Sequence, residues 1–426
     1  MITFDKCSSF KGNVKVPSDK SITHRAIIMG AMADGVSVVK KPLLSRDTLA
    51  TMNVMQQLGV SVVNERSRLL IHSEGVRNFK ESYDVLNCHN SGTTARLMMG
   101  VLAPSNIYSV LSGDASLLRR PMDRVINPLK QLGANIYSKA ESTLLPATVM
   151  PAKLKAGEIS SPVKSAQVKS AILLAGVQLE GATTYIENTP TRDHTERMFA
   201  AYGIKTESNN GKIIVHGGEL TQGKIDVPAD FSSAAFYIGA GLIFEGSEIV
   251  IENCGLNPSR TGLLTALKQL GVEVKTEITS NEVEPIGNIY VTSARIKGGK
   301  ISGDLVANMI DEIPILAMIA LFGEGPLEIR DAKELRVKES DRIMALINNF
   351  QALGAEIEEY EDGLKINPLR SQPTRATLLA YDDHRISMIN IILAKKFGVK
   401  ILLDNIASLD VSYPDFIGDL LSIEEK

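Results

Sequence analysis

The chain has few aromatic residues and few cysteines, and both shortages exclude kinds of site. It contains no tryptophan, and aromatic residues make up only 5% of its 426 residues. This composition argues against a site that stacks nucleobases or sugar rings on aromatic side chains. The three cysteines, Cys7, Cys88 and Cys254, lie far apart and form no C-x-x-C pair. They predict neither a disulfide framework nor a zinc site, and they favour a reducing compartment.

Strong net charge and long apolar runs are also missing. The net charge is −3 and the isoelectric point about 6.2, which argues against a nucleic-acid partner or a charged membrane surface. The longest apolar runs, near 234–244 and 313–322, are too short to span a bilayer, and residues 1–12 lack the apolar core of a signal peptide. We therefore expect a cytoplasmic protein that makes no use of a membrane, in which any anion site is built locally.

A recurring helix end is the first positive signal in a chain long enough for two domains. Five times, an apolar-periodic helix ends at a glycine that is followed by a small apolar residue and an alternating strand. These glycines are Gly59, Gly133, Gly203, Gly271 and Gly354. Each predicts a left-handed residue that turns the chain out of its helix. The copies lie about seventy to eighty residues apart, which indicates an internal repeat with a sixth, truncated copy near 414–423.

Turn residues between these helices predict hairpins, as at 209–211 and 361–363, so the expected class is α/β (α+β). Two further segments, 14–19 and 226–230, resemble each other. Each has an alternating strand, a proline, a small residue and an aspartate, and an apolar helix follows. A strand is expected over Val14–Pro17. The matching segments indicate two similar halves that face each other.

The segment from Asp19 to Arg25 has the pattern of an anion site. It opens an apolar run of small residues, as a turn into a helix does. The amides of the first helical turn, the hydroxyl of Ser21 and the cationic groups of Lys20 and Arg25 would then converge on one small volume. Such a volume suits a phosphate or a carboxylate. The alternative is a surface helix start with scattered charges.

Four further segments combine a helix start with polar or basic side chains. They are 90–96, 119–124, 164–170 and 191–196. Glycine with hydroxyls, or arginines at a helix N-terminus, favour a polar or anionic ligand. The alternatives are ordinary helix caps and a solvated surface. The second segment is expected just before a helix, with Pro121 near the first helical position.

An acidic pair and a mixed-charge run stand in the second half of the chain. Asp311 and Glu312 interrupt an apolar stretch, where buried acids need partners. Asp311 is therefore either a helix cap or a general base.

The mixed-charge run is Glu334–Arg342. There, Lys338 and Arg342 are predicted to share one helix face, with Glu339 paired to Arg342. The alternative is a surface lattice of ion pairs. Asp383-His384-Arg385 adds an arginine ahead of a further apolar helix.

Taken in chain order, these motifs resemble one enzyme family. They are Pro17–Arg25, Asn90–Thr93, Arg120–Met122, Ser165–Gln167, Lys338–Arg342 and Asp383–Arg385. Over its full length the chain resembles the enolpyruvyl transferases of the EPSP synthase (3-phosphoshikimate 1-carboxyvinyltransferase) family, in the branch called class II. The resemblance implies a two-domain inside-out barrel of six βαβαββ repeats, three per domain. Domain I would comprise 1–18 and 229–426, domain II 19–228, and a cleft would lie between them.

The resemblance also implies an activity and residues that carry it. The family transfers the enolpyruvyl group of phosphoenolpyruvate to the 5-hydroxyl of shikimate 3-phosphate and releases phosphate, in aromatic amino-acid biosynthesis. The residues implied for shikimate 3-phosphate are Lys20, Ser21, Arg25, Ser165, Ala166, Gln167, Arg192, Asp311 and Lys338. Those implied for phosphoenolpyruvate are Lys20, Gly92, Arg120, Gln167, Arg342 and Arg385.

The residue types fit this chemistry. Both substrates are polyanions, and cations from both domains would offset their repulsion. Because a C–O bond breaks rather than a P–O bond, we expect neither a metal nor a cofactor. Asp311 is assigned as the base for the 5-hydroxyl proton, and Glu339 as the acid that protonates the methylene carbon, with Lys20 assisting. Glu339 would then remove a methyl proton as phosphate leaves.

Gly92 bears on inhibition. Some glyphosate-insensitive members of the family carry alanine where Gly92 stands, and a glycine leaves room for the inhibitor. The resemblance therefore implies that glyphosate competes with phosphoenolpyruvate. The usual form in the family is a monomer, and we expect the same here.

Two other classes stay open at this point. A sister enzyme that acts on a UDP-sugar shares the fold but typically bears a reactive cysteine near the arginine cluster. No cysteine lies between Cys88 and Cys254. A non-catalytic anion-binding repeat protein would explain the cations but not Asp311 and Glu339. Phosphate release from a mixture of the two substrates separates the three classes.

Overall fold

The structure is a computed structural model that describes residues 1–425, and the chain divides into two compact units. We call Ser18–Val227 the inserted unit. The split unit is Met1–Pro17 together with the chain from Pro228 onward. These boundaries fall one residue before the expected ends at 18 and 228. Within the split unit, the amide of Asp230 donates to the carbonyl of Pro17 at 2.8 Å, so the departing and returning segments are hydrogen-bonded to each other.

The inserted unit contains seven helices, two 3-10 turns and three sheets. The helices are α1 (Lys20–Met32), α2 (Arg46–Gln57), α3 (Gly92–Leu102), α4 (Asp123–Gln131), α5 (Lys139–Ser142), α6 (Ala166–Gly176) and α7 (His194–Ala201), and the turns are η1 (Val76–Asn78) and η2 (Leu117–Arg119). The strands are β2 (Asp34–Lys40), β3 (Ser61–Glu65), β4 (Arg68–Glu74), β5 (Leu86–Asn87), β6 (Ser109–Ser112), β7 (Asn135–Ser138), β8 (Leu144–Met150), β9 (Glu158–Ser160), β10 (Ala182–Ile186), β11 (Thr206–Asn209), β12 (Lys212–His216) and β13 (Lys224–Asp226). They form sheets in the orders β13-β2-β4-β3, β5-β6-β8-β7 and β11-β12-β10-β9.

Each of these sheets repeats one topology. Two parallel strands, such as β5 and β6, are joined through a helix, and a second helix leads to an antiparallel hairpin such as β7–β8. The sheet of β9 to β12 has the same pairing. In the third sheet, β13 from the end of the unit is the parallel partner of β2 near its start. The repeat is therefore βαβαββ, with one copy closed by the two ends of the inserted unit.

The split unit contains a second set of the same elements. Its helices are α8 (Phe231–Ile243), α9 (Gly262–Gln269), α10 (Asp304–Asn308), α11 (Ile313–Ala320), α12 (Arg342–Ala352), α13 (His384–Phe397) and α14 (Phe416–Ser422), and its 3-10 turns are η3 (Lys333–Val337) and η4 (Ala407–Val411). Its strands are β1 (Ser9–Val14), β14 (Glu248–Gly255), β15 (Lys275–Asn281), β16 (Pro285–Thr292), β17 (Gly299–Ile301), β18 (Leu327–Ile329), β19 (Ile357–Tyr360), β20 (Gly363–Ile366), β21 (Ala376–Leu378), β22 (Ile401–Leu403) and β23 (Glu424–Glu425). The sheet orders are β15-β16-β14-β1-β23, β17-β18-β20-β19 and β21-β22.

The sixth repeat is truncated, as the sequence predicts. Strands β21 and β22 pair in parallel, but the strand after α14, β23, pairs antiparallel with β1. The expected strand over 14–17 is wrong, because β1 ends at Val14, where its parallel ladder with β14 stops opposite Ile251. Pro17 has no N–H with which to extend a ladder, so the chain leaves the sheet there.

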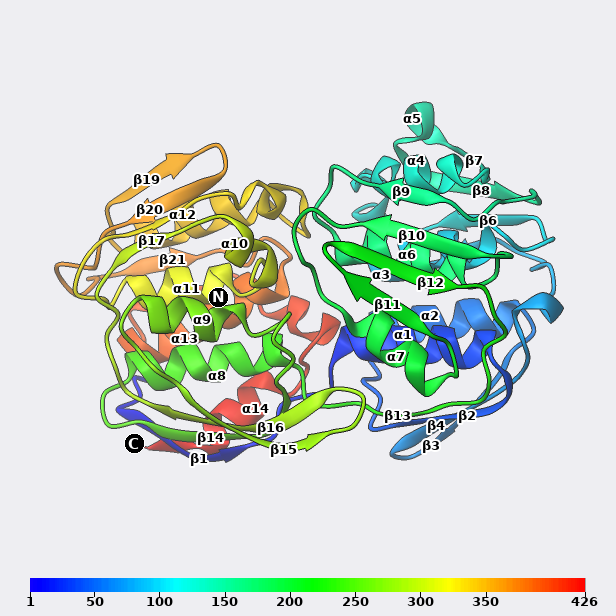
Figure 1. The fold of residues 1–426 in the computed structure, drawn as a ribbon. Helices are drawn as coiled ribbons and strands as arrows, with labels where there is room; N and C mark the ends of the chain where they lie inside the picture. Colours follow the sequence, from blue (N-terminus) through cyan, green and yellow to red (C-terminus); the bar gives the residue numbers. More distant parts are fainter. Residues whose placement is uncertain (426) are drawn as a thin grey trace. The chain divides into compact units, whose positions relative to one another are not determined.

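Buried helices form the centre of each unit, and the sheets cover them (Figure 1). Every residue of α8 is buried, as are Ile22–Met32 of α1. Helices α3, α6, α11 and α13 are also buried over most of their length. Such all-round burial is typical of a central helix, because a surface helix keeps one polar face. In the split unit, α8, α11 and α13 contact one another, with sheets on either side of them (Figure 1). This is the expected inside-out arrangement.

The five glycines that end the periodic helices all have positive φ, between 77° and 100°. After α2, the amide of Val60 donates to Met55 O at 3.1 Å, and after α9 the amide of Val272 donates to Leu267 O at 2.8 Å. This 6→1 bond marks a Schellman motif, which satisfies carbonyls left open at the helix end. The predicted helix ends are thus confirmed. Among the described residues, no helix is both long and apolar enough to cross a membrane.

Candidate active site

The buried helices of the inserted unit begin close together. The guanidinium of Arg25 on α1 donates to the hydroxyl of Ser170 on α6 at 2.7 Å. The side-chain amide of Gln167 on α6 donates to the hydroxyl of Thr93 on α3 at 2.9 Å. Each helix N-terminus carries a partial positive charge and unpaired N–H groups. Three of them in one place form a site suited to anions.

Arg25 and Ser21 lie on one face of α1, as predicted. Arg25 is 3% exposed, and its Nη1 donates to the carbonyl of Ser21 at 2.9 Å. Its Nε donates to the hydroxyl of Thr195 on α7 at 2.9 Å. The guanidinium is therefore held in place by hydroxyls of α6 and α7, not scattered on a surface.

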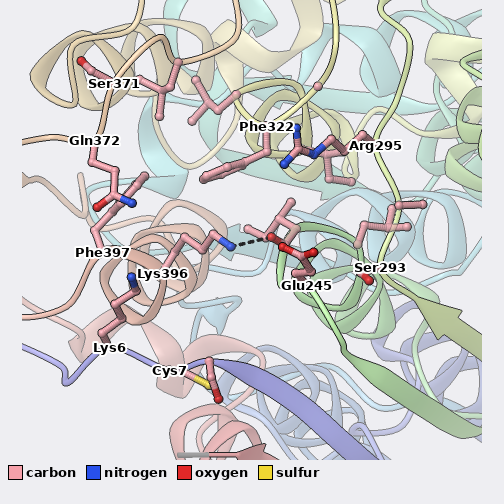
Figure 2. A pocket seen from close by; sticks show the side chains of 18 of the residues that line it. Lys6, Cys7, Glu245, Ser293, Arg295, Phe322, Ser371, Gln372, Lys396 and Phe397 are labelled. Carbon is pink, nitrogen blue, oxygen red and sulfur yellow. Dashed lines mark hydrogen bonds between the residues drawn. The ribbon is translucent and has the colours of Figure 1, made fainter.

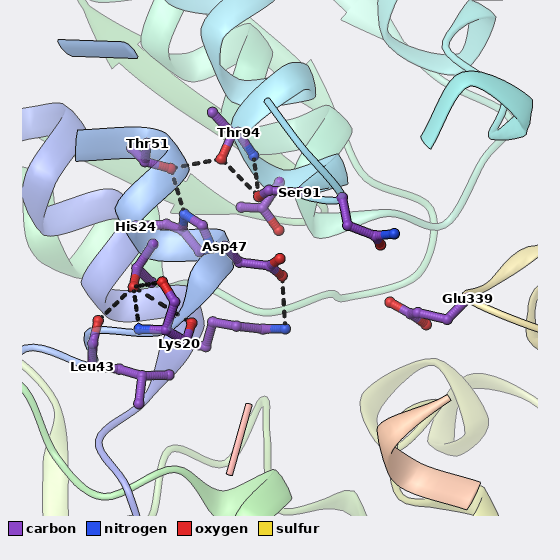
Figure 3. Close-up of polar contacts among 12 residues, drawn as sticks. Lys20, His24, Leu43, Asp47, Thr51, Ser91, Thr94 and Glu339 are labelled. Carbon is purple, nitrogen blue, oxygen red and sulfur yellow. Dashed lines mark hydrogen bonds and ion pairs between the residues drawn. The ribbon is translucent and has the colours of Figure 1, made fainter. Parts of the chain in front are cut away.

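Lys20 is the first residue of α1, and its ammonium lies 3.1 Å from the carboxylate of Asp47 on α2 (Figure 3). The N-cap residue Asp19 accepts a hydrogen bond from the amide of Ile22 at 2.8 Å. The Lys20 side chain is 20% exposed, so it stays accessible to a ligand. Asp47 was missed by the sequence reasoning, because nothing in the sequence shows that α2 packs beside the start of α1.

Neutral hydrogen bonds connect α1, α2 and α3 behind this lysine (Figure 3). The Nδ1 of His24 is 2.7 Å from the hydroxyl of Thr51. That hydroxyl is 2.7 Å from the hydroxyl of Thr94, and Thr94 donates to the hydroxyl of Ser91. Burial lowers the pKa of His24 well below its usual value, and the neighbouring cations of α1 lower it further. The imidazole is therefore neutral and contributes position rather than charge.

Two arginines surround Gly92, the first residue of α3. A methyl group at this position would lie 3.3 Å from Nη1 of Arg96 and 3.6 Å from Nη1 of Arg120. Arg96 Nη1 also donates to Oε1 of Gln167 at 2.6 Å, and Arg120 Nη2 donates to Oδ1 of Asn90 at 2.5 Å. Arg96 is absent from the predicted set, although its i,i+4 spacing from Gly92 could have revealed it.

The remaining predicted residues of the inserted unit lie at the starts of α6, α7 and α4. Ser165 is the N-cap residue of α6 but its hydroxyl does not cap the helix, and Ala166 is the first helical residue. Arg192 precedes α7. Pro121 lies near the helix start, as expected. Because α4 begins at Asp123, Pro121 stands just before the N-cap residue, where its missing N–H costs nothing.

A buried lysine anchors the segment that carries Arg192. Lys169 of α6 is 1% exposed, and its ammonium lies 2.8 Å from Glu196 and 3.1 Å from Glu187. It also donates to the carbonyl of Thr191 at 3.2 Å. Burial raises the pKa of Glu196, and Lys169 opposes this rise. The segment before α7 is thus tied to α6 through a buried charge cluster.

In the split unit, Arg342 is the centre of the predicted group. It is 1% exposed and contacts three carboxylates, Asp383 at 2.8 Å, Glu339 at 2.6 Å and Asp311 at 3.3 Å. Burial favours the neutral guanidine, but the three carboxylates outweigh burial and raise the pKa of Arg342. Arg342 therefore holds Asp311 and Glu339 side by side. A surface lattice of ion pairs is excluded here, because a pair in solvent would leave the arginine exposed.

Asp311 gathers the other predicted cations of this unit. Nζ of Lys338 is 3.5 Å from its carboxylate, and Nη1 of Arg385 donates to its carbonyl at 3.0 Å. The N-cap residue of α11 is Glu312, so the capping alternative for Asp311 is wrong.

The predicted common helix face for Lys338 and Arg342 is also wrong. Turn η3 ends at Val337, Lys338 has an extended backbone, and α12 begins only at Arg342. The predicted Glu339–Arg342 pair is confirmed, although it forms outside a helix.

A second buried cluster lies next to Asp311 in sequence and was missed. Glu312 is fully buried and accepts from the hydroxyl of Ser232 at 2.5 Å. Arg260 donates to the same hydroxyl at 2.6 Å and lies 3.4 Å from Asp230. The cluster joins the starts of α8 and α11, as the Arg25 contacts join helices in the inserted unit. Each unit therefore orients its central helices through a buried arginine and hydroxyls.

Comparison with known proteins shows which family has this fold and these motifs. The fold is similar to that of the enolpyruvyl transferase NikO from Streptomyces tendae, whose crystal structure covers 99% of this chain and 97% of its own, with a TM-score of 0.79 at 15% identity. A sequence model of EPSP synthase (3-phosphoshikimate 1-carboxyvinyltransferase) matches residues 4–420, so the chain belongs to the EPSP synthase family.

Individual relatives agree with this assignment. A 3-phosphoshikimate 1-carboxyvinyltransferase of Bacillus pumilus is 42% identical over 413 residues, which cover 96% of each chain. One of Bacillus subtilis is 40% identical over 99% of each chain. The structure of EPSP synthase from Acinetobacter baumannii has a TM-score of 0.86 at 35% identity and covers 99% of this chain and 97% of its own. The similarity therefore extends over nearly the whole chain, including the segments that carry the candidate site.

Proposed function

We propose that this chain transfers the enolpyruvyl group of phosphoenolpyruvate to the 5-hydroxyl of shikimate 3-phosphate. The products are 5-enolpyruvylshikimate 3-phosphate and phosphate, in aromatic amino-acid biosynthesis. The observation that carries the proposal is Asp311, held between Lys338 and Arg342 in a chain of the EPSP synthase family. A non-catalytic anion-binding protein would have no need of an acid in that position.

Shikimate 3-phosphate would bind through two groups of residues. In the inserted unit, the starts of α1 and α6 and the segment before α7 supply amides, hydroxyls and cations for the phosphate and ring hydroxyls. These residues are Lys20, Ser21, Arg25, Ser165, Ala166, Gln167 and Arg192. From the split unit, Asp311 would accept the 5-hydroxyl and Lys338 would lie beside it. This requires that the two units border one cleft.

Phosphoenolpyruvate would bind through Lys20, Gly92, Arg120 and Gln167 of the inserted unit and Arg342 and Arg385 of the split unit. Gly92 lets the substrate approach the backbone between Arg96 and Arg120. Arg342 contacts three protein carboxylates, of which Glu339 is nearest at 2.6 Å. The substrate would therefore take the place of Glu339 on the guanidinium and free that acid for proton transfer.

The proton transfers follow from these positions. Asp311 would take the 5-hydroxyl proton, and Glu339 would protonate the methylene carbon, with Lys20 assisting. As the C–O bond to phosphate breaks, Glu339 would remove a methyl proton and restore the double bond. Asp311 lies 3.5 Å from Lys338 and 3.3 Å from Arg342, which hold its carboxylate in place for this step.

Several further properties belong to the same proposal. Glyphosate, an anion that carries a carboxylate and a phosphonate, would compete with phosphoenolpyruvate at Gly92. The protein would act in the cytoplasm as a monomer. Its three cysteines are buried and free, in agreement with a reducing compartment.

Phosphate release tests the activity. We expect release from shikimate 3-phosphate with phosphoenolpyruvate and none when a UDP-sugar replaces the shikimate acceptor. Asp311→Ala and Asp311→Asn should lower kcat by about 100-fold or more, the usual contribution of a general base. Calorimetry should find the affinity for shikimate 3-phosphate changed far less. Glu273→Gln, at an exposed carboxylate paired with Lys268, is the matched control and should leave kcat unchanged. Unchanged turnover in both Asp311 variants would refute its role as base.

A further inference from the structure

The split unit contains a large cavity at the far ends of its central helices (Figure 2). Its volume is about 900 Å³. The wall includes Leu242 and Ile243 from the end of α8, Ile319 from the end of α11, and Lys396 and Phe397 from the end of α13. The N-termini of α11 and α13 lie at Asp311 and Arg385 of the candidate catalytic group. With a rise of about 1.5 Å per residue, the cavity is separated from that group by about 12–20 Å along the helices.

One side of the cavity is aromatic. The rings of Phe322 and Phe397 are stacked, with centroids 5.8 Å apart and an interplanar angle of 28°. Both side chains are half-buried, so part of each ring faces the cavity (Figure 2). With Leu242, Ile243 and Ile319, they make an apolar surface against which a flat ring can pack.

The other lining groups are mostly cationic. The basic residues are Lys6, Arg295, Arg370 and Lys396, against one acid, Glu245. Lys396 is the innermost of them. Its ammonium donates to the carbonyl of Ile243 at 2.7 Å and lies 4.6 Å from the ring centre of Phe244 and 5.6 Å from that of Phe322. Lys396 is partly buried, and a partly buried ammonium interacts more strongly with an incoming anion than an ammonium in open solvent does.

The partial negative charge of helix C-termini does not by itself explain why cations line this cavity. Helix C-termini favour cations, so both units should then show the same pattern. The inserted unit has a cavity of about 710 Å³ in the corresponding place, lined by Met32 at the end of α1 and Gln178 after α6. Its charged lining is Asp34, Glu74, Glu180 and Glu219 with the single cation Arg77. The charge is reversed at equivalent positions of the repeat, so the cations of the split unit need another explanation.

We propose that the cavity of the split unit is a second ligand site, which binds a small aromatic carboxylate. The ring of the ligand packs on Phe322 and Phe397, and its carboxylate pairs with Lys396 and, at the mouth, with Arg295. This site is separate from the substrate residues and does not depend on the proposed function.

Methyl NMR tests this proposal with 2-naphthoate and its neutral counterpart 2-naphthamide. In the full chain with labelled isoleucine methyl groups, Ile243 and Ile319 report on this cavity, and Ile107 reports on the cavity of the inserted unit. We expect 2-naphthoate to shift Ile243 and Ile319 but not Ile107, with or without saturating shikimate 3-phosphate. The amide should bind at least about tenfold more weakly, because it lacks the charge-assisted hydrogen bond.

Matched variants test which cations bind the carboxylate of 2-naphthoate. Lys396→Met keeps the aliphatic stem and should weaken 2-naphthoate at least about tenfold, whereas Arg77→Met in the opposite cavity should leave binding unchanged. Arg295→Gln, at an exposed position, does not threaten folding and should weaken binding about threefold. Equal binding of acid and amide, an unchanged affinity in both Lys396→Met and Arg295→Gln, or no shift of Ile243 and Ile319 at millimolar 2-naphthoate would each overturn the proposal.

Discussion

Arg342 determines the positions of two candidate catalytic acids at once. One buried guanidinium contacts Asp383, Glu339 and Asp311, and its planar set of donors can serve all three. Burial favours the neutral form of Asp383, but Arg342 outweighs this and lowers its pKa. A lysine would supply the charge without the geometry. The acids are therefore placed before any substrate arrives.

Gly92 should control the choice between substrate and inhibitor. In Gly92→Ala the new methyl group lies 3.3 Å from Arg96 Nη1, so the guanidinium ends must give way by a few tenths of an ångström. Because glyphosate is longer than phosphoenolpyruvate, it should suffer more. We expect the inhibition constant of glyphosate to rise at least about tenfold and the KM of phosphoenolpyruvate to rise less. Steady-state kinetics measure both.

Gly418→Ala is the control for this substitution, since a methyl group there meets no atom within 4 Å. Equal increases of the two constants in Gly92→Ala would count against a selective role for this glycine.

His24 should make the protein sensitive to mild acid. Its pKa in the folded state is well below the unfolded value of about 6.5, so the unfolded state binds the extra proton. Stability is then fully present above pH 6.5 and is lost as the pH falls below it, by about 1.4 kcal/mol per pH unit. His24→Asn keeps a polar atom near Thr51 and should remove this slope. Urea unfolding between pH 7.5 and 5 measures it, and parallel pH profiles for the two proteins would contradict the assignment.

At the scale of elements, the sequence predicts what is local and misses what depends on packing. The five helix-end glycines were visible because a positive φ is a property of one residue. The start of α12 is also a local property, since Asp341 caps it by accepting from Met344 N at 3.0 Å, whereas the spacing of Lys338 and Arg342 predicts an earlier start. Arg96 was missed because its partner Gln167 lies 71 residues away.

The catalytic group illustrates the same division. The motifs locate Asp311 and Arg385 at helix starts, which is local information. That Arg260 and Glu312 form a second buried cluster follows only once α8 and α11 are known to adjoin.

Alanine substitutions at two glycines distinguish the cost of a packing clash from the cost of backbone strain. A methyl group on Gly100 of α3 would lie 2.2 Å from the carbonyl oxygen of Ala171, backbone of α6 that cannot turn away. Gly100→Ala should therefore cost about 3 kcal/mol or more of the free energy of unfolding and lower kcat/KM, since Arg96 and Gln167 lose their alignment. Gly354→Ala meets no atom within 4 Å but has φ +88°, and should cost only about 1 kcal/mol. Urea unfolding of both variants should give this order, and the reverse order would show that α3 and α6 are not closely packed.

At the scale of the whole molecule, the chain supplies two cores and two groups of proposed substrate residues. Each unit has its own buried helices, and the connection passes twice between them, near Pro17 and Pro228. The cations of the split unit are paired with protein acids, as Arg342 is with Asp311 and Glu339. Under the proposed function, each polyanionic substrate binds residues of both units, so that ligand binding and compaction are coupled.

Small-angle X-ray scattering should detect this coupling. With saturating shikimate 3-phosphate and glyphosate, which cannot react together, the radius of gyration should fall toward about 22 Å, the value for a compact chain of this length. Inorganic phosphate alone should not cause the change, because it cannot contact both groups of residues. Lys20→Gln should need a higher ligand concentration, since it removes a cation assigned to both substrates, while Lys15→Gln, exposed and outside the site, should behave as the wild type. A radius of gyration that stays well above 22 Å with both ligands saturating would show that the two units do not meet around the substrates, and the shared site would have to be abandoned.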